Sequence, residues 1–273
     1  QAQQLKIVLG QNEIQWQHQE ENQSLVLKSG QIVATDLNNF NQYTLHTSPL
    51  EIIVNDKMWQ PLTVESRIRN NTTFAYFSFI DLAGVSKLLP LFEKDEATLA
   101  LIDKLDLSGS LKNIYLQNDG QGLQLSANIN DVTSHYSDGL PGIENVSGDI
   151  LLSGEQFQVN LVAEQGYFDF DKHFIEPIPY HKFTATFNAN KMDNDWHITS
   201  KALSLNSEEL SLTADIAIDI PKNGKVNLSL LASVNNVDVK YAEHYYPLLA
   251  MEDNLRNYLN KALISGKVTE AQV

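Results

Sequence analysis

The chain has 273 residues, 42% of them hydrophobic, and its 34 acidic and 19 basic residues give a formal net charge of −15. This apolar content is enough for a folded core, whereas a nucleic-acid groove needs concentrated positive charge, and no Lys/Arg cluster occurs. Cysteine is absent, which excludes zinc–thiolate sites, disulfides and thiol catalysis. No apolar run reaches the roughly eighteen residues that a membrane-spanning helix needs.

Two segments carry apolar residues at helical spacing between regions that have the pattern of strands. Residues 1–80 form the first β region. Residues 82–105 are then expected to be helical, with an interruption at Pro90, because proline removes a backbone donor and clashes with the preceding turn. Residues 241–264 repeat this helical pattern close to the end of the sequence.

Alternation of apolar and polar residues dominates the rest of the chain. From Leu210 to Ile220 every even position is apolar, which predicts a strand with one apolar and one polar face. Asn223-Gly224 favours a tight turn into the next strand, and Asp193-Asn194-Asp195 is expected to be a hairpin tip. The same alternation occurs at 123–129, 157–161, 183–189, 196–198 and 226–234. These segments predict an antiparallel meander.

The two helical segments belong to a sequence repeat. Pro247 lies 157 positions after Pro90 (247 − 90), and the residues around both prolines keep this offset without a gap. The identical pairs are Asp81 and Asp238, Pro90 and Pro247, Leu91 and Leu248, Lys104 and Lys261, Ser108 and Ser265, and Gly109 and Gly266.

The repeat predicts the domain organisation. Residues 1–80 are interpreted as the end of a preceding repeat, 81–237 as one full repeat, and 238–273 as the start of the next. Because stacked modules build an extended surface rather than a single pocket, we expect an interior part of a longer repeating protein, in which adjacent repeats of the same chain contact each other.

Two fold classes fit the alternation. In a closed β-sandwich the apolar faces of two sheets bury each other. In a long, curved antiparallel sheet with two helical inserts, the apolar face instead lines a groove. The long period and the helices favour the curved sheet, because an immunoglobulin-like module repeats near 100 residues and lacks such helices.

The groove has the dimensions of a lipid tail. A six-residue strand spans about 20 Å, and burying an acyl chain is worth about 0.8 kcal/mol per CH₂. Phospholipid acyl chains are therefore the expected ligand, with their polar heads left in water. The candidate lining residues are Leu123, Leu125, Phe157, Val159, Phe183, Phe187, Leu212, Ile216 and Ile218.

No motif predicts catalysis or a cofactor. Asp169, Asp171 and His173 would share one face of a strand and form the best metal-like cluster, although a solvated face explains them as well. We therefore expect no enzyme, no cofactor and no metal. A glycan-active enzyme with two carboxylates is the remaining catalytic alternative. Tyr245-Tyr246 either seals the sheet or forms a gate over the groove.

Several short segments resemble the AsmA-like/YhdP-type envelope proteins. They are Leu105–Ile114, Leu140–Asp149, Tyr246-Pro247-Leu248, Leu259 and Ser265–Val268, and the resemblance extends from about residue 75 onward. It implies a repeating β-groove protein, anchored in the inner membrane of Gram-negative bacteria, that carries phospholipid across the periplasm to the outer membrane. The alternative is a structural or adhesive β-repeat module of the cell envelope that binds no ligand.

Overall fold

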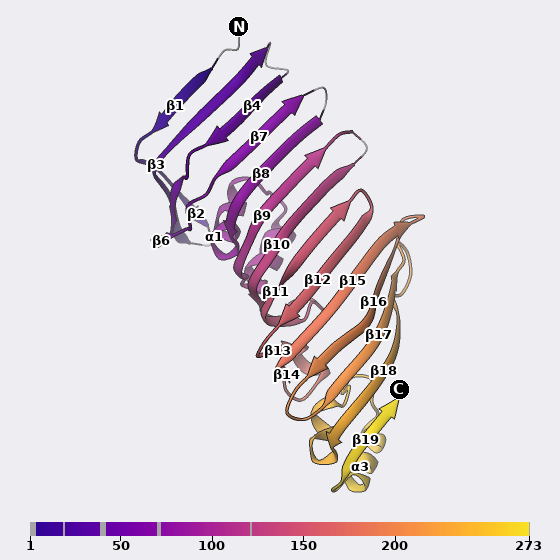
Figure 1. Ribbon diagram of the computed structural model, residues 1–273. Coiled ribbons are helices and arrows are strands. Elements are labelled where there is room, and N and C mark those ends of the chain that lie inside the picture. Colours follow the sequence, from indigo (N-terminus) through magenta and orange to yellow (C-terminus); the bar gives the residue numbers. More distant parts are fainter. Residues whose placement is uncertain (1–3, 19, 39–41, 70–71, 121, 273) are drawn as a thin grey trace. The chain divides into compact units, whose positions relative to one another are not determined.

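The computed structural model describes residues 4–18, 20–38, 42–69, 72–120 and 122–272. These residues form nineteen strands and six short helical segments (Figure 1). The strands pair antiparallel in an open sheet that does not close into a barrel, which confirms the mainly β fold class over the closed sandwich. Contacts divide the chain into two units. Unit 1 comprises Gln1–Asp103, Leu107–Asn130 and Asp149–Glu155, and unit 2 comprises Lys104–Asp106, Asp131–Gly148 and Gln156–Val273.

Unit 1 contains β1 to β9, α1 and η1. The elements α2, β10 and β11 have residues in both units. Its helical segments are α1 (Leu82–Leu88), the 3₁₀ turn η1 (Leu89–Leu91) and α2 (Glu96–Leu105). The strands are β1 (Leu5–Leu9), β2 (Asn12–His18), β3 (Glu21–Asn38), β4 (Gln42–Thr47), β5 (Glu51–Val54), β6 (Lys57–Met58), β7 (Val64–Arg69), β8 (Thr72–Asp81), β9 (Ser108–Asn118), β10 (Leu123–Ser134) and β11 (Gly142–Ser153).

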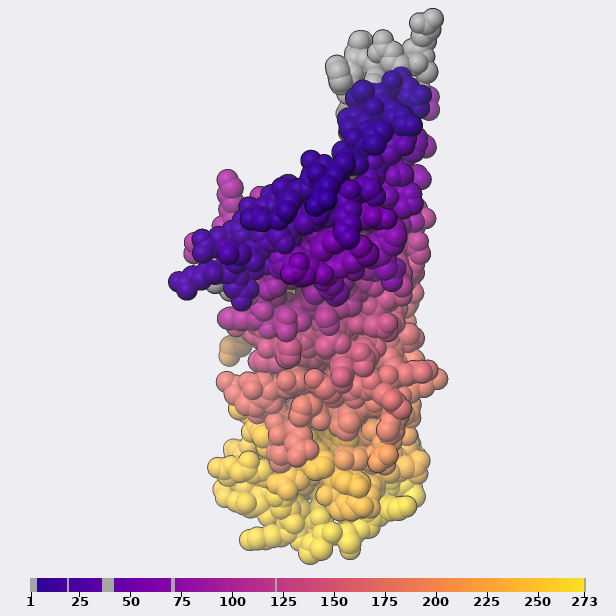
Figure 2. Space-filling view, turned by 90° about the vertical axis from the view of Figure 1, so that its left-hand side faces the viewer, coloured from indigo at the N-terminus to yellow at the C-terminus, as the bar shows by residue number. Residues whose placement is uncertain are grey.

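The long strand β3 joins two sets of strands within unit 1. Its residues 30–34 pair with β1, whereas residues 21–27 pair with β2 and residues 25–29 with β5. The indigo residues of this branch extend to one side of the unit in Figure 2. Alternation in residues 1–80 did not predict this branching, because one continuous strand supplies both pairings.

A small core lies where α1 meets the branch. Val54, Trp59 and Phe79 are buried, and Val85 and Leu88 of α1 pack against them. The Trp59 and Phe79 rings meet edge to face with centroids 6.3 Å apart. The helix therefore covers apolar side chains at one end of the strands.

The sequence repeat has a counterpart in hydrogen-bond register. Asp81 on β8 pairs with Ser110 on β9, and the positions 157 later, Asp238 and Lys267, pair with each other. Both aspartates also cap the helix that follows, since Asp81 accepts from the Gly84 amide and Asp238 from the Lys240 amide. The two segments therefore share local structure as well as sequence. The division into repeats at 80/81 and 237/238 stays a prediction.

Unit 2 contains the remaining elements. Its helical segments are the 3₁₀ turns η2 (Asp171–His173) and η3 (Val239–Tyr245) and the helix α3 (Asp253–Ala262). The strands are β12 (Gln156–Ala163), β13 (Gly166–Asp169), β14 (Ile178–Tyr180), β15 (Lys182–Met192), β16 (Asp195–Asn206), β17 (Ser211–Ile220), β18 (Asn227–Asp238) and β19 (Lys267–Gln272).

Two local predictions need correction, and two others are confirmed. Helix 82–105 is interrupted near Pro90, as expected, but the second segment is α-helical only over Asp253–Ala262. Asn223-Gly224 lies in a six-residue connection between β17 and β18 rather than in a tight turn, because Asn223 does not adopt the positive φ that a primed turn requires. Asp193 and Asn194 do adopt positive φ, at 52° and 73°, which confirms the hairpin tip.

A β-bulge in β16 bends the sheet of unit 2. Ser200 pairs with Ile216 and Leu203 with Ala214, so β16 has one residue more than β17 between these pairs. Ala202 in the bulge has φ +54°, and its amide donates to the Asp215 carboxylate at 2.8 Å. Such a bulge increases local twist and lets the sheet curve.

Replacing Ala202 with glycine is expected to stabilise the protein. An L-residue at φ +54° costs about 1 to 2 kcal/mol, which exceeds the entropy that glycine adds to the unfolded chain. We therefore expect Ala202→Gly to raise the free energy of unfolding by about 0.5 to 1 kcal/mol in urea titrations. Ala217→Gly, in the regular part of β17, is the matched control and should lower stability instead. A loss of stability in both variants would contradict the strained bulge.

Candidate functional site

One face of five consecutive strands in unit 2 is apolar. Directly paired residues of antiparallel strands project to the same side of a sheet, so the registers define this face. We name it the apolar face. It consists of Phe157, Val159, Leu161 and Ala163 of β12, Phe183, Ala185, Phe187 and Ala189 of β15, Ile198, Ser200, Leu203 and Leu205 of β16, Leu212, Ala214, Ile216 and Ile218 of β17, and Leu228, Leu230, Ala232 and Val234 of β18.

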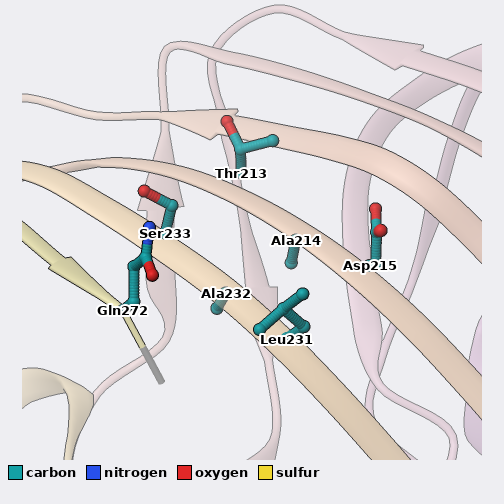
Figure 3. A pocket seen from close by; sticks show the side chains of 7 residues that line it. All are labelled: Thr213, Ala214, Asp215, Leu231, Ala232, Ser233 and Gln272. Atoms are coloured by element: carbon teal, nitrogen blue, oxygen red, sulfur yellow. The ribbon is translucent and has the colours of Figure 1, made fainter.

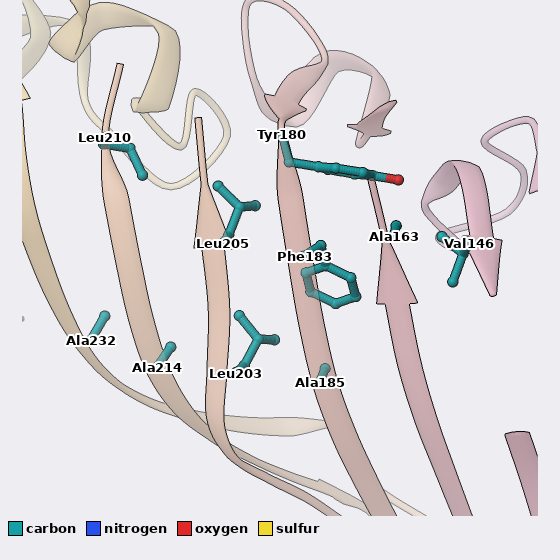
Figure 4. Packing of buried hydrophobic residues seen from close by; sticks show 10 residues of the cluster. All are labelled: Val146, Ala163, Tyr180, Phe183, Ala185, Leu203, Leu205, Leu210, Ala214 and Ala232. Carbon is teal, nitrogen blue, oxygen red and sulfur yellow. The ribbon is translucent and has the colours of Figure 1, made fainter. Parts of the chain in front are cut away.

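Exposure of the apolar face changes along the strands. At one end, Phe183 and Leu205 are buried, whereas at the other end and on β18, Leu230 is 52% and Leu228 is 65% exposed. Buried side chains of the cluster lie side by side on neighbouring curved strands (Figure 4). The face is thus sealed around Phe183 and Leu205 and open on β18, while Ala189 and Val159 on the neighbouring strands stay buried. It combines features of both sequence-based alternatives.

Three segments close the buried end. They are the η2 region, the β16–β17 turn and the η3 region, and hydrogen bonds connect them. The Tyr245 hydroxyl donates to the Glu209 carboxylate at 2.9 Å, and the Leu248 amide donates to the His173 carbonyl at 2.9 Å. Tyr245 also packs against the buried cluster, and burial raises the pKa of its hydroxyl above the ordinary value. These contacts favour the interpretation of Tyr245-Tyr246 as a seal.

Tyr180 anchors the same end from β14. Its side chain is 2% exposed and its hydroxyl donates to the Glu144 carbonyl of β11. The ring lies 5.0 Å from Phe168 and 6.0 Å from Phe183, centroid to centroid. Burial raises the pKa of the Tyr180 hydroxyl to about 12.

This raised pKa predicts an alkaline loss of stability. Unfolded tyrosine titrates near 10, so between pH 10 and 12 the native state binds the Tyr180 proton more tightly than the unfolded state. The associated stability is complete below pH 10 and is lost as pH rises towards 12. We expect Tyr180→Phe to unfold about 1 kcal/mol more easily at pH 9 and to show a shallower decline above pH 10 in urea titrations. Equal declines in both proteins would contradict this role.

The opposite face of the same strands is mainly polar, although Val162 and Leu231 are also exposed on it. Asn160, Thr186, Thr199, Thr213 and Asp215 project from it, as the registers require. A shallow depression of about 220 Å³ lies over β17–β19, lined by Thr213, Ala214, Asp215, Leu231, Ala232, Ser233 and Gln272 (Figure 3). Its one carboxylate, Asp215, accepts the Ala202 amide, so the depression does not present paired acids for hydrolysis.

Seven predicted lining residues lie together on the apolar face: Phe157, Val159, Phe183, Phe187, Leu212, Ile216 and Ile218. Leu123 and Leu125 are on β10, in the part that belongs to unit 1, where Leu123 is exposed and Leu125 half-buried. That any of these residues contacts lipid stays a prediction.

The predicted cluster of Asp169, Asp171 and His173 has a different geometry. β13 ends at Asp169, and Asp171 and His173 lie in η2, where the Asp169 carboxylate accepts the Asp171 amide. The expectation of one shared strand face is therefore wrong, because Asp171 adopts a positive φ that ends the strand. No group of three or more potential metal ligands occurs among the described residues. In that same part of the chain, none of the helices has the length and apolarity needed to cross a membrane.

Sequence reasoning missed part of the site. Leu203, Leu205 and Tyr180 are buried in it, and Ser200 lies at its centre. The β16 bulge shifts the apolar positions from even to odd numbers, so strict alternation ends at Ile198. The run Leu203-Ser204-Leu205, in which apolar residues again alternate with a polar one, was the signal that could have extended the predicted strand 196–198.

The described residues define a mainly β protein with a repeated sheet-and-helix segment and, in unit 2, an apolar face that spans five paired strands. The chain belongs to the YhdP family, because the family model described as YhdP protein matches residues 1–273. Comparisons with curated proteins and with solved structures found no match.

Proposed function

We propose that the apolar face binds phospholipid acyl chains and forms part of a non-enzymatic path for lipid transfer across the cell envelope. Tails lie against the apolar face and polar heads stay in water at its open end. Membership of the YhdP family supports a location in the envelope, and the path then runs through the periplasm, between the inner and outer membranes of a Gram-negative cell. An inner-membrane anchor elsewhere in the whole protein belongs to the same proposal.

The observation that carries the proposal is the continuity of the apolar face, which runs across five paired strands of unit 2. Leu228 and Leu230 project from the apolar face into solvent, while their strand neighbour Ser229 lies on the opposite face. Exposing large aliphatic side chains in a contiguous patch is costly in water, so such patches mark sites that another apolar group covers. An acyl chain fits a strip that runs across successive strands.

Photo-crosslinking in cells tests the proposal. A photoreactive amino acid replaces Leu230 in one strain and Ser229 in another, because these neighbours are both exposed and project to opposite faces. We expect phospholipid adducts at Leu230 and none at Ser229. Asp215 also lies on the opposite face, but it is a poor control position because its carboxylate accepts the Ala202 amide and so holds the β16 bulge.

Adducts at neither position, in a folded protein, would reject lipid binding and leave a structural or adhesive β module as the better interpretation. Adducts at both positions would indicate non-selective contact with membrane lipid rather than a path along the apolar face.

A further inference from the structure

Ser200 is the single polar residue of the apolar face. It is 1% exposed, and its Oγ atom has no hydrogen-bond partner among the described residues. Its direct cross-strand neighbours are Phe187 and Ile216. A buried hydroxyl without a partner destabilises a fold, whereas alanine at the same place would avoid that cost. The hydroxyl therefore calls for a partner that the chain itself does not supply.

The local structure keeps this hydroxyl on the apolar face. The bulge begins immediately after Ser200, and the bond from the Ala202 amide to the Asp215 carboxylate holds it in place. Leu203 then resumes the apolar face on the far side of the bulge. Ser200 thus lies at a fixed position, with Ile216 half-buried and Leu230 exposed in the same row across the strands.

The chemistry of the surroundings restricts the partner. Acyl methylenes offer no hydrogen-bonding group, and a phosphate or ammonium group would be costly to bury among apolar side chains. A neutral carbonyl needs only one donor to be accommodated there. In a phospholipid, such a carbonyl is the ester that joins the acyl chain to glycerol.

We propose that the Ser200 hydroxyl donates a hydrogen bond to the ester carbonyl of a lipid whose acyl chain lies on the apolar face. This inference rests on the proposed function and assigns a chemical class to its ligand, an ester-linked lipid. The carbonyl approaches from the side of Ile216 and Leu230, where exposure increases along the row. Because Ser200 itself is 1% exposed, the Ile216 side chain has to shift for this contact to form. Ser200 fixes how deeply the lipid sits and discriminates against lipids without a carbonyl.

Binding of matched ester and ether lipids tests the proposal. The purified chain is titrated with dioleoyl phosphatidylethanolamine and with its dialkyl ether analogue, and bound lipid is measured by native mass spectrometry. The wild type should bind the ester about fivefold more tightly, the equivalent of about 1 kcal/mol for one hydrogen bond. Ser200→Ala should bind both lipids equally and should melt no lower than the wild type.

Ser204→Ala is the matched control, because Ser204 lies on the same strand but projects from the polar face. It should keep the preference for the ester. Equal binding of both lipids by the wild type, or a preserved preference in Ser200→Ala, would overturn the role of Ser200 while leaving the proposed function intact. Binding of neither lipid would overturn both.

Discussion

A carboxylate at the open end of the apolar face, introduced as Leu230→Asp, is expected to reduce bound phospholipid at least about tenfold. A charged group surrounded by acyl chains costs about 2.5 to 3.5 kcal/mol, as in the centre of a membrane, and partial contact with water lowers this figure. A tenfold loss of affinity corresponds to about 1.4 kcal/mol, so half of the cost of burying the charge is enough to produce it. The measurement is the lipid that co-purifies with the protein, quantified by mass spectrometry.

Leu230 suits this test because its side chain is 52% exposed. The aspartate can therefore remain hydrated without lipid, and the protein should still fold. Ser229→Asp is the matched control, with the same new charge one residue away on the polar face. Unchanged lipid content in Leu230→Asp, or an equal loss in both variants, would contradict binding along the apolar face.

Ile216→Asp places the same charge deeper. Ile216 pairs with Leu230 and packs against the buried cluster, so this variant should lose lipid and also some stability. If the Ile216→Asp protein folds but binds no lipid, it supports the same conclusion as a loss of lipid in Leu230→Asp. Complete unfolding of Ile216→Asp would place Ile216 in closed core, and the ligand-accessible surface would then be limited to the open end.

Much of the architecture was predictable from local patterns. The offset between Pro90 and Pro247 anticipated two structurally similar segments, and it reappears in the pairing of Asp81 with Ser110 and of Asp238 with Lys267. Alternation from Leu210 to Ile220 anticipated the two faces of β17. The repeat is present in the sequence itself, and alternation follows from strand geometry, so neither signal requires knowledge of the tertiary structure.

The missed features depend on backbone geometry that alternation does not encode. A bulge changes which positions face inward, and this hid Leu203 and Leu205. The positive φ of Asp171 ended a strand that alternation would have continued through His173. Ser200 was overlooked for another reason: a lone serine in a strand is ordinary in sequence, and only its burial makes it unusual.

Gly148→Ala is expected to be the most destabilising small substitution in unit 2. Gly148 lies in β11 at φ +155°, and an added Cβ would overlap the Asn160 backbone oxygen and come within 2.9 Å of its carbonyl carbon. Backbone atoms of a paired strand cannot rotate aside as a side chain would. We expect a loss of about 3 kcal/mol or more in the free energy of unfolding, measured by urea denaturation.

Gly154→Ala separates this contact from conformational strain. Gly154 also has a positive φ, at 59°, but an added Cβ would meet nothing within 4 Å. Gly154→Ala should lose only about 1 to 2 kcal/mol, as is typical of an L-residue in the left-handed region, which is half of the effect at Gly148 or less. Equal losses would mean that the strands yield at Asn160. A larger loss at Gly148 would mean that the backbone at Asn160 does not move aside. Asn160 lies between Val159 and Leu161, so the substitution would then also disturb the part of the apolar face that β12 provides.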